Sequence, residues 1–344
     1  MRVLYPGRIV SRNVGGNTTY GRAVMAGVQR AGLSTAEIPA GENPLSTLIK
    51  ENAARYRRQV PADLIHYLAD TGSLIGGGTP SVVTVHGIAS RWIDGVRSPL
   101  KEYVWRSRVH RAISTSVAVV TPSKSSACDI AEVFDVPIER IAVIPHGIEH
   151  MTLNGVLQPL SEEVRNRIPA EFLLYVGNIE PRKNLEALIA AMDEPGVRSL
   201  GLKLVIAGKP AWNYDMTMAA IKSSSHVIYL GFVSDSDRNA LMKACTAFVF
   251  PSRYEGFGFP VLEALSAGRP VITSDRGSLA EVAGPSWISE DLSSEGIGDS
   301  IASALNDSGW LAHCVEEGPR WVTRFSWEVS IKSHLDVYRK VCGQ

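Results

Sequence analysis

Short apolar runs alternate with longer segments of helical periodicity along most of the chain. Few polar residues interrupt these runs, which is typical of parallel strands covered on both faces. They lie at 3–5, 64–68, 81–85, 117–120, 141–144, 172–177, 202–208, 227–231, 247–251 and 270–274. Helical patterns follow many of them, for example at 184–193, 235–244, 294–306 and 327–342. The repeated alternation predicts an α/β protein with doubly wound parallel sheets.

The segment 145–170 interrupts this alternation. It is rich in Pro, Gly and Asn and has no convincing strand pattern, as expected of a linker between domains. We therefore expect one Rossmann-like domain over 1–150 and a second over 151–325. The last helix, over 326–344, is expected to cross back to the first domain. In two facing parallel-sheet domains, ligands bind in the cleft at the carboxyl ends of the strands.

Composition narrows the classes of function. The chain has 344 residues, and its 35 basic residues balance its 35 acidic ones, so it lacks the basic excess of a general nucleic-acid binder. Its four cysteines lie far apart and form no disulfide framework, which fits a reducing compartment. No apolar run reaches the roughly 18 residues that would span a bilayer, and the N-terminus is too short an apolar run for a signal peptide. We interpret the protein as cytoplasmic.

Two glutamates bracket the sequence GFGFPVL near the end of a predicted strand. Glu255 is expected in the loop, and Glu263 in the first turn of a helix opened by Pro260. Gly256 and Gly258 permit a close approach of the backbone, and amides at a helix start attract phosphate. An acid beside a phosphate is tolerated where it meets hydroxyls, which favours a nucleotide-sugar ligand. Alternatively, Glu263 only complements the helix dipole and Glu255 is a solvated loop acid.

Two further loops follow predicted strands. In GNIEPRKNLEALIAA (177–191), Arg182 and Lys183 precede a helix expected near Asn184, and they could neutralise a leaving diphosphate. The alternative is a solvated basic pair. In the loop 11–21, Gly15 and Gly16 permit close approach to a ligand, although no GxGxxG fingerprint is present and an ordinary turn is equally compatible.

The segments YEGFGFPVLEALSAGRPVITS, GNIEPRKNL, VIAGKPAW, YLGFVSD, TVHGI and IPHGI together resemble the retaining glycosyltransferases of family 4. The resemblance covers nearly the whole chain and implies the GT-B fold, with two Rossmann-like domains facing across a cleft. It assigns 1–150 to the acceptor side and 151–325 to nucleotide-sugar binding. The sequence after Gly284, PSWISEDLSS, departs from the family pattern.

The resemblance also implies roles for individual residues. Glu255 would bind donor-sugar hydroxyls, Arg182 and Lys183 the diphosphate, and His86, in TVHGI, would face the donor sugar near the reaction centre. Taken by itself, His86 is more often a structural loop histidine. The expected donor-binding residues are Gly15, Gly16, Gly256, Phe257, Gly258, Phe259, Val261, Leu262 and Glu263, with Glu263 on the ribose.

The implied activity is transfer of a hexose such as mannose or glucose from a nucleotide-diphosphate-sugar to a hydroxyl. The acceptor would be a glycan, a lipid-linked glycan or a natural product, and the anomeric configuration would be retained. No His/Asp/Glu cluster with metal-ligand spacing is evident, so we expect neither a metal nor another cofactor. Three alternatives stay open: a nucleotide-sugar epimerase, a non-catalytic nucleotide-binding subunit, and a glycoside hydrolase that uses the two glutamates.

A basic segment at 96–115 raises the possibility of membrane contact. It carries Arg97, Lys101, Arg106, Arg108 and Arg111 against one acid, with Tyr103 and Trp105 interleaved. Such a helix could rest on the anionic inner face of a membrane. The alternative is a solvated face with two buried aromatic residues.

Overall fold

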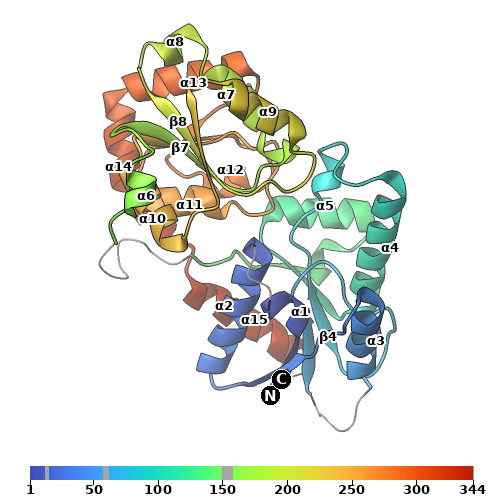
Figure 1. Cartoon of the computed structure of the whole chain (residues 1–344). Coiled ribbons are helices and arrows are strands. Elements are labelled where there is room, and N and C mark those ends of the chain that lie inside the picture. Colours follow the sequence, from blue (N-terminus) through green and yellow to red (C-terminus); the bar gives the residue numbers. More distant parts are fainter. Residues whose placement is uncertain (12–14, 57–61, 149–157, 344) are drawn as a thin grey trace. The chain divides into compact units, whose positions relative to one another are not determined.

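The computed structural model describes residues 1–11, 15–56, 62–148 and 158–343 (Figure 1). The chain forms two compact units. The first unit comprises Met1–Gly147 and Phe325–Gln344, and the second comprises Ile148–Arg324. The junction expected at residues 150 and 151 lies outside the described residues.

The first unit contains a six-stranded parallel sheet of order β2-β1-β3-β4-β5-β6. Its strands are β1 Arg2–Pro6, β2 Ser34–Ile38, β3 Leu64–Tyr67, β4 Ser81–Thr84, β5 Ala118–Thr121 and β6 Ile141–Val143. Its helices are α1 Gly7–Val10, α2 Gly16–Arg30, α3 Pro44–Ala54, α4 Pro99–Thr115, α5 Lys124–Phe134 and α15 Trp327–Val341, with 3-10 turns η1 Ala89–Arg91 and η2 Ile138–Arg140.

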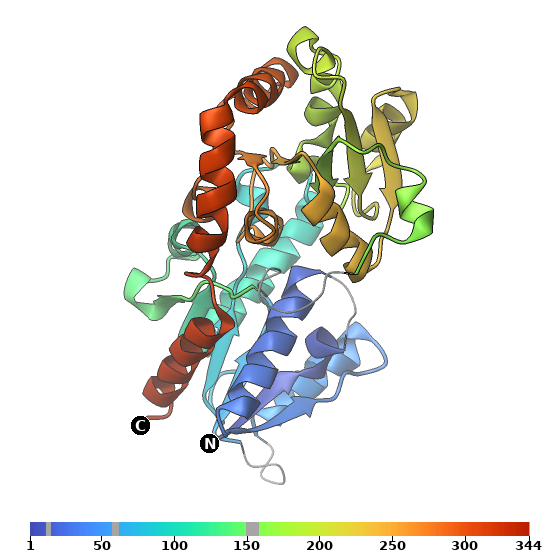
Figure 2. The same cartoon turned by 90° about the vertical axis from the view of Figure 1, so that its left-hand side faces the viewer.

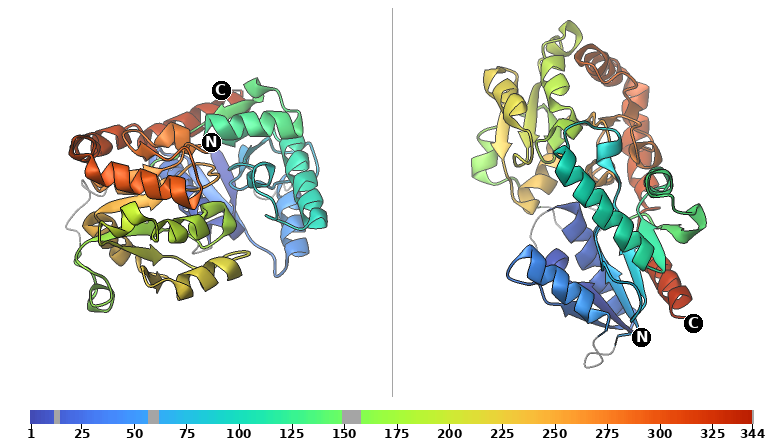
Figure 3. Two further views of the ribbon diagram at one scale, coloured as in Figure 1. Left: turned by 90° about the horizontal axis from the view of Figure 1, so that it is seen from above. Right: turned by 90° about the vertical axis from the view of Figure 1, so that its right-hand side faces the viewer.

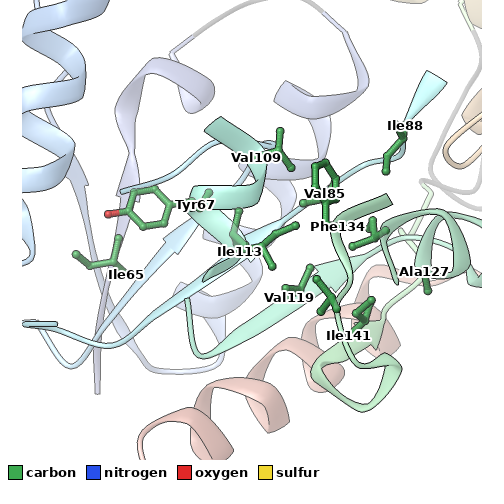
Figure 4. Close-up of a cluster of buried hydrophobic side chains, with 14 of the residues drawn as sticks. Ile65, Tyr67, Val85, Ile88, Val109, Ile113, Val119, Ala127, Phe134 and Ile141 are labelled. Atoms are coloured by element: carbon green, nitrogen blue, oxygen red, sulfur yellow. The ribbon is translucent and has the colours of Figure 1, made fainter. Parts of the chain in front are cut away.

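Successive residues of the central strands enter different cores. Ile65 and Val119 join one apolar cluster, together with side chains of α4 and α5 (Figure 4). Their neighbours Leu64 and Val120 join a second cluster, which includes side chains of α2 and α15. Because side chains alternate between the two faces of a strand, burial on both faces requires continuous apolar strands.

The C-terminal helix α15 belongs to this first unit and packs against α2, as Figure 2 shows. Helix α15 lies close to two glycines, Gly27 of α2 and Gly147 after β6. A Cβ at Gly27 would lie 2.4 Å from Cγ1 of Ile331, and one at Gly147 would lie 2.2 Å from the backbone nitrogen of Trp327. Larger residues at these positions would clash with helix α15.

The second unit repeats the architecture with a sheet of order β12-β11-β10-β7-β8-β9. Its strands are β7 Phe172–Val176, β8 Lys203–Ala207, β9 Val227–Gly231, β10 Ala247–Phe250, β11 Val271–Thr273 and β12 Trp287–Ile288. Its helices are α6 Glu162–Arg165, α7 Leu185–Ala191, α8 Pro195–Arg198, α9 Asp215–Ser223, α10 Asp235–Ala244, α11 Phe259–Ser266, α12 Leu279–Val282, α13 Ser294–Asn306 and α14 Ser308–Val322, with the 3-10 turn η3 Pro181–Lys183. Further views are given in Figure 3.

The predicted fold class is confirmed, since all ten predicted apolar runs form strands of two parallel sheets. Two strands were not predicted. Strand β2 reads STAEI, and β12 contains two residues within the PSWISEDLSS segment that departs from the family pattern. Both are edge strands, which have a neighbour on one side only and need less apolar surface.

Candidate functional site

The loop after strand β10 carries Glu255 and leads into helix α11. Gly258, just before this helix, has a φ of +108°, which favours glycine, and a Cβ there would lie 2.9 Å from Leu279. The helix begins at Phe259, one residue earlier than predicted. Pro260 is therefore its second residue, and Glu263 lies in the second turn rather than the first.

Arg182 and Lys183 lie on the 3-10 turn η3 rather than directly before an α-helix. The left-handed residue Asn184 (φ 58°) separates this turn from α7. The turn is fixed to the loop after β10, because the backbone N–H of Arg253 donates to the carbonyl of Arg182 at 2.9 Å. Strands β7 and β10 are neighbours in the sheet, so their carboxyl ends bring the two loops together.

The carboxylate of Glu255 is bound by both predicted cations. Arg182 Nη1 donates to Oε2 at 2.6 Å, and Lys183 Nζ donates to Oε1 at 2.5 Å. Glu255 and Lys183 are buried, and Arg182 is half-buried. Three residues predicted from two separate segments thus form one contiguous ionic group.

A fourth member of this group, Glu180, was not predicted. Its Oε1 accepts hydrogen bonds from Nε of Arg182 at 2.8 Å and from Nη2 of the same guanidinium. We refer to Glu180, Arg182, Lys183 and Glu255 as the ion cluster. With two acids and two bases, its formal charge is zero. The motif IEPRKN contains Glu180, and its spacing of two residues from Arg182 was the available signal.

The ion cluster determines the charge state of Glu255. Burial would raise the pKa of this carboxyl, but the positive charges of Arg182 and Lys183 outweigh burial and hold the pKa at about 2. Burial, together with the charge of Arg182, lowers the pKa of Lys183, while the two carboxylates oppose this change. Glu255 is therefore ionised at neutral pH, which suits it to accept hydrogen bonds from hydroxyls.

Glu263 lies outside the ion cluster in the described part of the chain. Its side chain keeps 20% of its surface exposed, and its Oε2 lies 4.0 Å from Nε of Arg238 on α10. Burial raises the pKa of Glu263, with Asp235 adding to the increase and Arg238 opposing it. The two predicted glutamates thus have opposite pKa shifts.

The remaining donor-binding candidates of this segment are largely core residues. Val261 and Leu262 are fully buried, and Phe257 is nearly so. The rings of Phe257 and Phe259 make an edge-to-face contact with centroids 5.1 Å apart. Because the side chains of Val261 and Leu262 lie in the core, any contact that these two residues make with a ligand comes from their backbone.

In the first unit, His86 follows strand β4. Its Nε2–H donates to the carbonyl of Leu68 at 2.8 Å, and its backbone N–H donates to Oδ1 of Asp70 at 3.0 Å. Burial lowers the pKa of His86, although Asp70 and the carbonyl of Leu68 oppose this. A neutral ring that donates through Nε2 has Nδ1 as its acceptor.

Gly15 and Gly16 lie at the start of helix α2, with Gly15 as the N-cap and Gly16 as the first helical residue. Gly15 has a φ of +83°, and a Cβ built on it would meet no atom within 4 Å. A glycine is therefore favoured at position 15 by the backbone conformation, and not by a lack of space for a side chain. Residues 12–14 of the predicted loop lie outside the described residues.

Sequence reasoning missed a buried hydrogen-bonded chain behind His86. It runs from Tyr5 through Tyr338, His66, Thr84, Tyr20 and His334 to the carbonyl of Ser330, with donor–acceptor distances of 3.3, 2.7, 2.8, 2.8, 2.8 and 2.7 Å. The Tyr20 ring also contacts the His86 ring at 5.0 Å. No local sequence motif indicates this series of hydrogen bonds, because its members come from β1, β3, β4, α2 and α15.

The direction of this chain is fixed at one end. A carbonyl can only accept, so Nδ1 of His334 donates and its Nε2 accepts from Tyr20. Burial lowers the pKa of His334 to about 4 and that of His66 well below its usual value, so both rings are neutral. Each of the other side chains, starting at Tyr5, then donates a hydrogen bond to the next side chain in the direction of His334. We refer to this hydrogen-bonded series of side chains as the neutral network.

Across the described ranges, no group of three or more His, Cys, Asp or Glu residues is placed to hold a metal ion. Sequence reasoning overlooked one Asp-x-Asp triplet, Asp235 to Asp237. Asp237 accepts hydrogen bonds from the backbone of Ser161 and from the hydroxyl of Ser234, and Asp235 pairs with Arg238. These contacts account for both acids as parts of the start of α10.

Both halves of the chain match known family models. The model described as Glycosyl transferases group 1 matches residues 161–321, and the model described as Glycosyltransferase Family 4 matches residues 14–151. The O-antigen chain mannosyltransferase B of Escherichia coli is 29% identical over 250 residues, which cover 67% of this chain and 62% of that protein. The MMP alpha-(1->4)-mannosyltransferase of Mycolicibacterium hassiacum is 29% identical over 285 residues, 78% of this chain and 67% of that protein. The chain thus matches less than two thirds of the length of the first relative.

Solved structures with a similar fold include the sucrose-phosphate synthase from Thermosynechococcus elongatus, with a TM-score of 0.76, 19% identity and 99% of each chain covered. Another is Anabaena HepE in complex with UDP-glucose, with a TM-score of 0.75, 17% identity and coverage of 99% of this chain and 100% of that chain. At such identities the similarity concerns the fold alone, and it confirms the predicted GT-B class.

Proposed function

Because the chain belongs to the family 4 glycosyltransferases, we propose that it transfers a hexose from a nucleotide-diphosphate-sugar to a hydroxyl of a glycan acceptor. The observation that carries this proposal is the ion cluster, in which an ionised Glu255 and two cations meet at the carboxyl ends of adjacent strands. Mannose or glucose is the favoured hexose, since relatives are named as mannosyltransferases and Anabaena HepE was solved with UDP-glucose.

In this mechanism the second unit supplies most of the electrostatic stabilisation. Arg182, Lys183 and the N-terminus of α11 stabilise the negative charge that grows on the leaving diphosphate. Glu255 accepts hydrogen bonds from hydroxyls of the donor sugar, and Glu263 does so from the ribose. Retention of configuration follows if the acceptor attacks on the face that the diphosphate leaves and gives its proton to the leaving phosphate.

We propose ligand-binding roles for residues of the first unit as well. A neutral His86 offers Nδ1 to a sugar hydroxyl, because its Nε2–H is donated to Leu68. Gly15 and Gly16 provide the backbone approach to the phosphates. We propose acceptor binding by this unit, which the family resemblance assigns to the acceptor side.

The hydrolase alternative fits the ion cluster poorly. A nucleophilic carboxylate needs an oxygen that can attack the sugar. Both oxygens of Glu255 accept hydrogen bonds from cations, which reduces their nucleophilicity.

Since Arg182 and Lys183 can provide the charge that a metal would supply, we also propose that transfer is independent of a metal and continues in the presence of a chelator.

Calorimetric titration with UDP, GDP, ADP and dTDP tests the donor site. One nucleotide should bind selectively, and Glu263→Ala should weaken it by about 1.5–3 kcal/mol, the contribution of a hydrogen bond to a charged group. Glu171→Ala is the matched control, because Glu171 is an exposed acid of the same unit. Unchanged affinity in Glu263→Ala would remove the ribose assignment, and no binding of any nucleotide would contradict the donor site as a whole.

We further propose that helix α4 places the protein peripherally on the inner, anionic face of a membrane. Glu102 pairs with Arg97 and Arg106, and Trp105 packs against the core. The outward surface is instead apolar at Leu100, Tyr103 and Val104, which are 73%, 71% and 48% exposed. No helix in the described ranges is long and apolar enough to cross a membrane. Apolar side chains beside Lys101 suit insertion at an anionic interface.

Flotation with vesicles containing phosphatidylglycerol tests this surface. Wild type should float with anionic vesicles and not with neutral ones, and Leu100→Ser combined with Tyr103→Ser should abolish flotation. Val315→Ser, which changes an exposed apolar residue of the second unit, should float like wild type. Equal recovery of the double variant and wild type would contradict the proposal.

A further inference from the structure

Glu180 is a buried acid whose contacts are directed at one of the proposed diphosphate-binding residues. It keeps 5% of its surface exposed. Its Oε1 accepts from two nitrogens of Arg182. A buried carboxylate at an anion-binding site opposes the anion, so its presence beside Arg182 requires an explanation.

Part of the explanation is geometric. An arginine side chain has five N–H donors in a planar fork. Two are directed to Glu180, and Nη1 is directed to Glu255 and to the carbonyl of Tyr254 at 2.9 Å. Contacts along both edges of the guanidinium fix its plane. Glu180 therefore holds Arg182 in the orientation in which it contacts Glu255.

The other part is electrostatic. Lys183 is paired with Glu255, and Arg182 lies between Glu255 and Glu180. Glu255 also has to bind the donor sugar in the proposed mechanism, so it cannot be exchanged for an uncharged group. Glu180 has no such task, yet it brings the formal charge of the cluster from +1 to zero.

We propose that Glu180 is an internal counter-ion that positions Arg182 and weakens the binding of the nucleotide diphosphate product. This inference rests on the proposed function, since it takes Arg182 as a ligand of the diphosphate. Glu180 is a positioning residue, because it acts through Arg182. An excess of positive charge would hold the fully charged diphosphate product more strongly than the transition state, in which that charge is only partly developed, and would therefore slow product release.

The test compares Glu180→Gln with wild type in nucleotide titrations and in steady-state kinetics. Glutamine keeps an oxygen that can accept from Arg182 and removes the charge. The nucleotide that wild type binds should bind the variant about tenfold more tightly, because one repulsive charge near the diphosphate is gone. Both kcat and KM for the donor should fall, since the product leaves more slowly. Glu171→Gln makes the same charge change at an exposed site and should alter none of these values.

Weaker or unchanged nucleotide affinity in a folded Glu180→Gln variant would overturn the inference, because a purely structural role predicts one of these results. If Glu180→Gln does not fold, Glu180→Asp should increase nucleotide affinity about twofold, because its carboxylate lies farther from Arg182. Equal or lower affinity in Glu180→Asp would then overturn the inference. Failure of wild type to bind any of the four nucleotides would contradict the proposed function itself, so the two failures are distinguishable.

Discussion

Each unit buries a polar network beneath the ends of its strands, but the two networks differ in charge. The first unit holds the neutral network, in which tyrosine, histidine and threonine side chains donate in one direction to a backbone carbonyl. The second unit holds the ion cluster of Glu180, Arg182, Lys183 and Glu255. The neutral network joins helix α15 to the sheet, whereas the ion cluster joins two loops.

This difference in charge distinguishes a polar network that stabilises the fold from one that is a candidate catalytic or binding site. A buried neutral network stabilises a fold when every member is satisfied. Buried ion pairs give little net stability, because desolvation offsets their attraction. The ion cluster is therefore better explained by a ligand that competes for its cations than by a contribution to folding.

Among the substitutions that test this difference between the two networks, Glu255→Gln should have the largest effect on activity and stability. It leaves Arg182 and Lys183 without their shared carboxylate and removes the proposed acceptor for sugar hydroxyls. We expect kcat/KM to fall by a factor of about 10² to 10³, and the free energy of unfolding to fall by about 3 kcal/mol. Kinetics and urea unfolding measure the two quantities. Wild-type activity in this variant would show that the ion cluster is structural.

Acid should affect the two units in different pH ranges. His334 has an ordinary pKa of 6.5 when unfolded and about 4 when folded, so its contribution is complete above 6.5 and is lost as the pH falls towards 4. For Glu255 the corresponding range runs from 4.5 down to about 2. Each shift corresponds to about 3 kcal/mol. The first unit should therefore loosen at a higher pH than the second.

Hydrogen exchange, read by mass spectrometry and corrected for intrinsic pH dependence, can follow peptides of each unit. Near pH 5, peptides of α2 and α15 should lose protection while peptides of β7 and β10 keep it. His334 is in contact with Tyr20 and the carbonyl of Ser330, and the His66 ring lies nearby. Loss of protection at a higher pH in the second unit than in the first would contradict this prediction.

Tyr20→Phe should destabilise the protein less than Glu255→Gln or acid does. It removes one hydroxyl from the neutral network and leaves Thr84 and His334 without that partner. We expect a loss of about 1–3 kcal/mol in the free energy of unfolding, with nucleotide binding unchanged. Tyr103→Phe, on the exposed face of α4, is the control and should match wild type. If both variants unfold alike, the network does not contribute to stability.

Much of the fold was predictable because fully buried strands have a distinctive sequence. Strands such as FLLYV and AFVF lie between two helical layers and contain no charged residue. Strand β2, which reads STAEI, lies at an edge and keeps polar residues, so its sequence resembles a loop. The two residues of β12 are too few for any pattern to be detected.

The candidate site was predictable in part. Arg182, Lys183 and Glu255 were identified as separate candidates, and the adjacency of β7 and β10 explains why they meet. Their direct ion pairs were not predicted, because sequence does not specify which of several nearby charges pair. Glu180 looked like an ordinary loop acid for the same reason. The neutral network was invisible, since Tyr338 and His66 are 272 positions apart.

The most direct test of the central claim is the configuration of the sugar that the enzyme releases from its donor. The nucleotide identified by titration fixes which α-linked donors of mannose and glucose to use. Water can replace the unknown acceptor, and proton NMR follows the free hexose before it mutarotates. The account predicts that the α-anomer forms first and that Lys183→Ala slows its release more than it weakens donor binding. Initial release of the β-anomer would contradict a retaining transfer at this site.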